Sequence, residues 1–100
     1  MARNILAMQN VHGVYLTASS APTADILKAA RRAISPGRRA YTTIGLYTPE
    51  GELLDVAVMD GEQYKRLPRE EWATTKMRDM RAEPEAWRML TQHVVLMEGI

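Results

Sequence analysis

The chain has 100 residues, of which 46% are hydrophobic and 25% charged, and its formal net charge is +1. These values are typical of one globular domain, residues 1–100, and argue against disorder. The absence of cysteine excludes disulfides, zinc ribbons and thiol catalysis, and the two histidines, His12 and His93, are too few for a histidine-rich metal site.

The sequence contains no candidate for a membrane span. No apolar run approaches the roughly 20 residues that a spanning helix needs. The first residues, MARNILAMQNVHG, also lack the apolar stretch of a secretory signal peptide. We therefore expect a cytoplasmic protein that does not enter a membrane.

The N-terminal region has two short apolar runs, residues 5–8 and 14–17, on either side of the polar stretch 10–13. Both runs contain β-branched or aromatic residues, which favour strands. The pattern predicts a β-hairpin, with one bent strand as the alternative.

Residues 21–35 carry the signals of a helix at both ends. Ser20 or Thr23 can cap the N-terminus, and Asp25 in the first turn suits the helix dipole. Pro36 ends the helix, because proline disfavours a helical residue before it. An apolar stripe at helical spacing is formed by Ile26, Leu27, Ala30 and Ile34.

Residues 41–59 predict a central hairpin around a type I turn at 48–51, in which Pro49 and Gly51 supply the required backbone angles. A three-residue loop pairs Tyr47 with Leu53 and Leu46 with Leu54. This register places one set of side chains in the core: Ile44, Leu46, Leu54, Val56 and Val58. The same register turns a second set outward: Tyr41, Thr43, Gly45, Tyr47 and Asp55.

The remainder of the chain is expected to be helical. Asp60 and Gln63 form a capping-box pattern ahead of a short helix over 61–67. Prolines open two further helices, over 68–81 and 84–97. In the last helix the stripe Trp87, Leu90, Val94 and Met97 is expected to face inward, with Trp87 in the core. A terminal strand over 94–96 is the alternative, because those residues have high β propensity.

These elements predict an α+β domain. A small antiparallel sheet, made of the central hairpin 41–59 and one or two N-terminal strands, is expected to be packed on one face by the helix 21–35 and the C-terminal helices. One hairpin does not determine the strand order.

Charge is unevenly distributed along the chain. Residues 1–50 carry six basic and two acidic residues, a charge of +4, whereas residues 51–100 carry seven basic and ten acidic residues, a charge of −3. A basic cluster lies on the outer side of the first helix and just after its end: Lys28, Arg31, Arg32, Arg38 and Arg39. Such a cluster can bind phosphates or an acidic protein surface, or it can stabilise the C-terminus of the helix.

Two pairs of aromatic or methionine side chains are further candidates for contact surfaces. Tyr41 and Tyr47 share the outward face of the hairpin, and tyrosine is enriched in interfaces. Trp72 and Met77 are candidates for self-association. The alternative is that these residues belong to a covered sheet face or to the core, because the chain has no phenylalanine.

No arrangement of residues supports catalysis. His12, Ser20 and Asp55 lack the spacing of a known triad, and Glu70 and Glu71 are adjacent, so their side chains diverge on a helix. The six glycines are scattered and form no phosphate-binding loop. We therefore expect no enzymatic activity, no cofactor and no metal.

The sequence is typical of a small non-catalytic regulator, inhibitor or assembly factor that docks on a protein partner. The expected contact residues are Arg31, Arg32, Arg38, Arg39, Tyr41 and Tyr47. The alternative is a nucleic-acid-binding or nucleic-acid-mimicking regulator, and the third reading is a small ligand-binding or catalytic domain. A homodimer is compatible with each of them.

Overall fold

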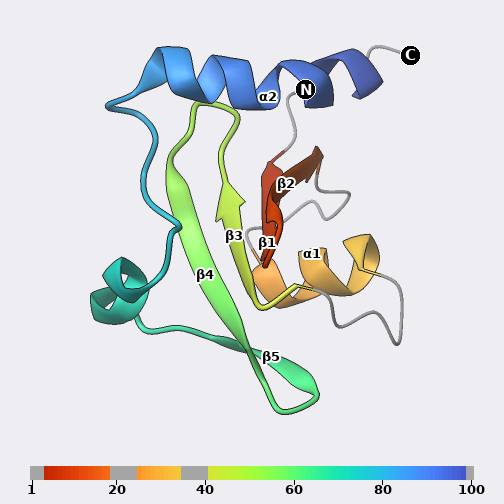
Figure 1. Cartoon of the computed structure of the whole chain (residues 1–100), viewed down its shortest axis with the longest axis vertical. Coiled ribbons are helices and arrows are strands. Elements are labelled where there is room, and N and C mark those ends of the chain that lie inside the picture. The colour runs from red at the N-terminus through yellow and green to blue at the C-terminus, as the bar shows by residue number, and fades with distance from the viewer. Residues whose placement is uncertain (1–3, 19–24, 35–40, 99–100) are drawn as a thin grey trace.

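The computed structural model describes residues 4–18, 25–34 and 41–98 and confirms the α+β class (Figure 1). Its strands are β1 (Ile5–Asn10), β2 (Gly13–Ala18), β3 (Thr43–Tyr47), β4 (Leu53–Asp60) and β5 (Gln63–Arg66). Its helices are α1 (Ile26–Ala33), a short 3-10 helix η1 (Arg69–Thr74) and α2 (Pro84–Glu98). In the described part of the chain, the five strands form one sheet in the order β2-β1-β3-β4-β5, and all neighbours are antiparallel.

The predicted N-terminal hairpin is confirmed as β1 and β2. The Asn10 side chain stabilises its turn, because Oδ1 accepts hydrogen bonds from the backbone N–H of His12 (2.8 Å) and of Gly13 (3.2 Å). Asparagine favours such turns because its side chain can replace a backbone acceptor.

The turn of the central hairpin has the predicted geometry, but the register beyond it is different. The N–H of Gly51 donates to the carbonyl of Thr48 (3.0 Å), and Tyr47 pairs with Leu53 as expected. A β-bulge follows, and Leu46 lies opposite Asp55. The predicted pairing of Leu46 with Leu54 is therefore wrong, because one extra residue in β4 shifts every later pair by one position.

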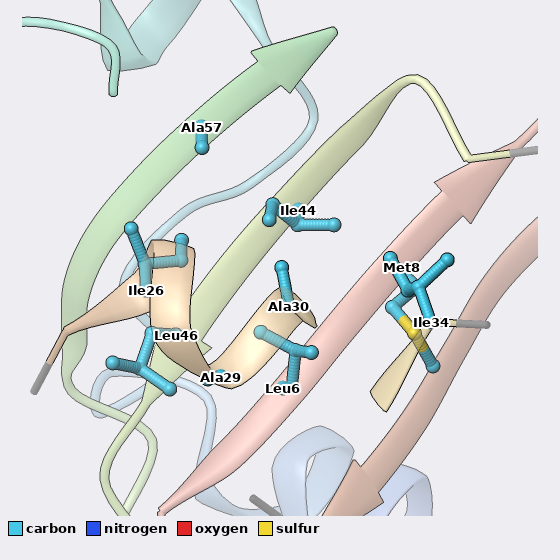
Figure 2. Packing of buried hydrophobic residues seen from close by; sticks show 9 residues of the cluster. All are labelled: Leu6, Met8, Ile26, Ala29, Ala30, Ile34, Ile44, Leu46 and Ala57. Carbon is cyan, nitrogen blue, oxygen red and sulfur yellow. The ribbon is translucent and has the colours of Figure 1, made fainter. Parts of the chain in front are cut away.

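The sheet is covered on both faces, whereas we expected the helices to cover one. Figure 2 shows the first cluster, in which α1 packs over three strands; its members are Leu6, Met8, Ile26, Ala29, Ala30, Ile34, Ile44, Leu46 and Ala57. The opposite face carries a second cluster: Ile5, Ala7, Tyr47, Leu53, Val56, Met77, Met80 and Trp87. Of the five hairpin residues predicted for the core, Ile44, Leu46 and Val56 are buried, and Leu54 and Val58 are half-buried.

The predicted first helix is present as α1, and its N-cap is Asp25. The Asp25 carboxylate accepts hydrogen bonds from the backbone N–H of Leu27 (3.1 Å) and of Lys28 (3.2 Å). A carboxylate at this position satisfies free donors of the first turn. The expected caps Ser20 and Thr23 lie outside the described residues.

Two predicted helices between residues 60 and 81 are wrong. The capping-box pattern at Asp60 is instead a hairpin turn, in which Gly61 has a positive φ of 65° and Asp60 pairs with Gln63. Glycine at the first position of a two-residue loop is a hairpin signal, because it adopts a positive φ without strain. The expected helix over 68–81 is reduced to η1, and residues 75–83, here called the connecting segment, follow without regular structure.

The last helix is confirmed as α2. Residues 93–97 belong to this helix, so the alternative of a terminal strand is wrong. Trp87 is buried as expected, but Leu90 is 50% exposed, so the apolar stripe does not face inward along its whole length. The side chains of Val94 and Met97 lie outside the described part. Within the described residues, no helix has the length and apolar content of a membrane span.

Candidate interaction surface

The structure places the two described arginines of the basic cluster on the surface. Arg31 and Arg32 are exposed in the last turn of α1, whereas Arg38 and Arg39 lie outside the described residues. Tyr41 is half-buried against the α1-side cluster, and its carbonyl accepts a hydrogen bond from the Tyr64 hydroxyl (2.9 Å). A partner-binding role for these residues stays a prediction.

The prediction that Tyr47 lies on an outward face is wrong, because its side chain belongs to the buried cluster on the sheet face opposite α1. It is 4% exposed, and its ring centroid lies 4.9 Å from that of Trp87. The hydroxyl donates to the carbonyl of Arg78 (2.9 Å) and accepts from the Arg78 N–H (3.2 Å). Burial raises the pKa of this hydroxyl. The error arose because the connecting segment covers the face that was expected to meet solvent.

Met77, one of the two residues predicted for self-association, is buried, and a self-association role for Trp72 stays a prediction. Its exposure is 4%, and its Sδ lies 3.9 Å from the Tyr47 hydroxyl. Trp72 is half-buried; its indole N–H donates to the carbonyl of Leu67 (2.9 Å), and the guanidinium of Arg69 lies 5.0 Å from its ring centroid. Met77 and Trp72 therefore both make their contacts with residues of the same chain.

The connecting segment and the first turns of α2 are attached to the β3–β4 hairpin by backbone and side-chain hydrogen bonds. The Met80 N–H donates to the carbonyl of Gly51 (2.8 Å), and the indole N–H of Trp87 donates to the carbonyl of Pro49 (2.8 Å). The Asp79 carboxylate accepts from the Leu53 N–H at 3.3 Å. The pKa of Asp79 is lowered, chiefly because the Arg81 side chain donates a hydrogen bond to it (3.0 Å). These contacts hold Met77 and Met80 against the sheet.

A groove of about 230 Å³ lies between β2, the connecting segment and α2. Its apolar lining comprises Ala7, Val14, Leu16, Tyr47, Met77, Met80, Trp87 and Leu90. Two cations, Lys76 and Arg78, complete it. The two hollows near β5 differ, because Asp60, Lys65 and Arg66 contribute charged groups to both.

The groove is bordered by β2, an edge strand that carries no charged residue. The carbonyl of Gln9 accepts from the N–H of Thr42 on the β3 side (2.9 Å), and Gln9 lies opposite Val14. Because the backbone groups of successive residues in an antiparallel strand point to opposite sides, those of Val14 point away from β1. The same alternation directs the groups of Leu16 outward. Within the described residues, no strand pairs with this side of β2.

Apolar side chains at this edge are exposed. Val14 is 43% exposed, Tyr15 47% and Leu90 50%. Val14 and Leu16 point to the groove side, because they lie opposite Gln9 and Ala7 at alternate positions of β1. An open apolar strand edge is a template for pairing with another chain.

The one sequence signal for this surface is the uncharged run GVYLTA. The run predicts a strand, but it does not indicate that the strand lies at the edge of the sheet. Neither the position of β2 in the sheet nor the approach of the connecting segment follows from local patterns. Comparison of the chain with family models, curated proteins and solved structures found no match.

In the described part of the chain, no group of three histidine, aspartate or glutamate side chains is arranged to hold a metal ion. The chemistry available at the groove is therefore that of backbone hydrogen bonds, apolar contact and cationic side chains.

Proposed function

We propose that this chain is a non-catalytic binding protein that receives an extended segment of a partner protein along β2. The observation that supports this most directly is the uncharged edge strand with outward backbone groups beside an apolar groove. Addition of a strand to a sheet edge is a recurring mode of peptide recognition, in which main-chain hydrogen bonds contribute affinity and side-chain pockets contribute specificity.

The size of the groove favours a side chain over a whole small molecule. Ligand pockets for drug-sized molecules have volumes of roughly 300–1,000 Å³. The groove is smaller, about 230 Å³, and it opens beside a strand that can hold a peptide backbone. A single large apolar side chain buried there contributes about 1.5–3 kcal/mol.

This proposal moves the main contact away from the basic end of α1. Arg31 and Arg32 remain exposed at the other face of the sheet, where α1 packs. Among the hollows lined by described residues, the one between α1 and β5 is lined chiefly by polar and charged side chains, so it is less suited to an apolar side chain than the groove beside β2.

A selection from random octapeptides displayed on phage tests the proposal. We expect the wild type to enrich peptides that the Val14→Pro variant does not, because proline removes an N–H that points away from β1 and leaves the β1–β2 pairs intact. The matched control is Val14→Thr, which keeps the N–H and the branched shape and should enrich the wild-type peptides. Circular dichroism melting verifies that all three proteins are folded.

The proposal fails if the wild type enriches no peptide, or if Val14→Pro enriches the same peptides as the wild type. Either result would show that the outward backbone of β2 takes no part in binding.

A further inference from the structure

The two cations that line the groove, Lys76 and Arg78, differ in whether an acidic side chain pairs with them. Arg78 forms a salt bridge with Glu83 (Nε to Oε2, 3.1 Å). Lys76 is exposed, and no acidic side chain among the described residues pairs with it. The neighbouring hairpin, residues 4–18, contains neither aspartate nor glutamate. The lining of the groove is therefore cationic, because it contains Lys76 and Arg78 and no acidic residue.

We infer that the segment received along β2 is acidic and carries one large apolar side chain that enters the groove. This inference rests on the proposed function and names the chemistry of its partner. In an extended segment, alternate side chains point to the same face. An apolar residue flanked at two-residue spacing by aspartate or glutamate would therefore present its apolar group to the groove and its carboxylates toward Lys76.

A second copy of this chain is a poorer occupant of the same edge. Two-fold pairing of β2 with itself would bring together two identical surfaces. Each surface would present Lys76 and a hairpin without acidic residues, so neither copy would supply the missing negative charge. An acidic segment from another protein supplies it.

Four synthetic peptides test the inference: TETLTET, the lysine version TKTLTKT, the neutral version TQTLTQT, and TETATET, which lacks the apolar anchor. Binding of each fluorescein-labelled peptide is measured by anisotropy at low salt. We expect TETLTET to bind at least about tenfold more tightly than the other three, because like charges oppose association and the anchor contributes buried apolar area. Raising the salt concentration should reduce its advantage over TQTLTQT.

Charge reversal in the protein provides the matched variants. Lys76→Glu should invert the preference, so that TKTLTKT binds more tightly than TETLTET. Lys65→Glu, an equal change at an exposed residue of the distant strand β5, should leave the preference unchanged. Equal effects of the two variants would assign the preference to net charge and overturn the inference.

The failure of the inference and the failure of the proposed function have different signatures. If TQTLTQT or TKTLTKT binds as tightly as TETLTET and Val14→Pro abolishes that binding, the edge receives a peptide but does not select acidic residues. If no peptide binds at up to about 1 mM, where binding free energy is only about −4 kcal/mol, both statements fail. A dimer in light scattering that Val14→Pro dissociates would identify a second copy as the occupant and overturn the inference.

Discussion

The two edges of the sheet differ in length, charge and exposure. β5 has four residues, of which Lys65 and Arg66 are charged, and Pro68 follows shortly after it. β2 has six residues, none of them charged, and its first half is exposed. Natural proteins protect edge strands by short length, charge and nearby proline. β5 uses all three, and β2 uses none.

This difference indicates that the two edges serve different purposes. The Arg66 guanidinium lies 2.7 Å from the buried carboxylate of Asp55 in the neighbouring strand, so β5 is attached to the sheet by side chains as well as by backbone. On the other side, the apolar residues of β2 continue into the groove formed with the connecting segment. The β5 edge is protected, whereas no described strand pairs with the outer side of β2.

The largest expected effect on stability comes from removing Trp87, a buried side chain that lines the groove beside β2. We expect Trp87→Ala to lower the free energy of unfolding by about 3–5 kcal/mol, because it leaves a cavity where a buried ring contacts Tyr47 and anchors the turn at Pro49. Urea unfolding followed by circular dichroism measures the loss. Leu90→Ala, on the same helix but half exposed, should cost less than about 1 kcal/mol. A smaller loss of stability in Trp87→Ala than in Leu90→Ala would contradict the conclusion that Trp87 is the buried residue of this helix face and Leu90 the exposed one.

The second-largest expected loss of stability tests the β5 edge of the sheet. Arg66→Ala leaves the Asp55 carboxylate, with a side-chain exposure of 8%, without its ion pair. Breaking a fully buried pair costs about 3–5 kcal/mol, but the Arg66 side chain is largely in solvent, so we expect about 1–2 kcal/mol. Lys65→Ala, its exposed neighbour, should change stability by about 0.5 kcal/mol or less. Equal costs in urea unfolding would mean that the side-chain attachment of β5 contributes nothing.

The smallest effect concerns the hydroxyl beneath the groove. Tyr47→Phe removes the hydrogen bonds with Arg78 and should cost about 1 kcal/mol at neutral pH. Burial raises the pKa of Tyr47 above the ordinary value of 10.0, so the folded state holds this proton more tightly than the unfolded chain. The resulting stabilisation is complete below pH 10 and is lost as the pH rises through the raised pKa.

The alkaline behaviour provides a second measurement of the same hydroxyl. As the pH rises above 10 and through the raised pKa, the wild type should lose more stability than Tyr47→Phe, because the variant has no hydroxyl to ionise at this position. Tyr15→Phe, which alters an exposed side chain at the open edge, should follow the wild type. An identical decline in Tyr47→Phe and the wild type would place the alkaline loss elsewhere.

Local chemistry was sufficient to predict the parts of the fold that depend on neighbouring residues. The turn closed by Gly51, the N-terminal hairpin, α1 and the start of α2 at Pro84 were all predicted from turn, cap and periodicity signals. Each of these signals acts within a few residues, which is why they survive in the folded chain.

Features that depend on distant contacts were not predicted. The bulge near Leu54 has no local marker, and it changed the partner of every later residue in β4. The proline at position 68 predicts a helix over 68–81, but Met77 and Met80 pack on the sheet without helical structure. Tertiary packing overrides helix propensity in such segments. The position of β2 at the edge of the sheet also depends on contacts between distant residues, so it follows from the strand order and not from local sequence.

The attachment of the connecting segment to the hairpin turn has a consequence for the emerging chain during synthesis. Gly51 has a φ of 96°, and a Cβ at this position would lie 3.1 Å from the Cβ of Met80, so the two segments fit together with little free space. A nascent chain that has emerged only through β5 contains the strand edge but not Met77, Met80 or Trp87. The groove therefore requires residues up to Leu90, and a nascent chain that ends at β5 has the strand edge without the groove.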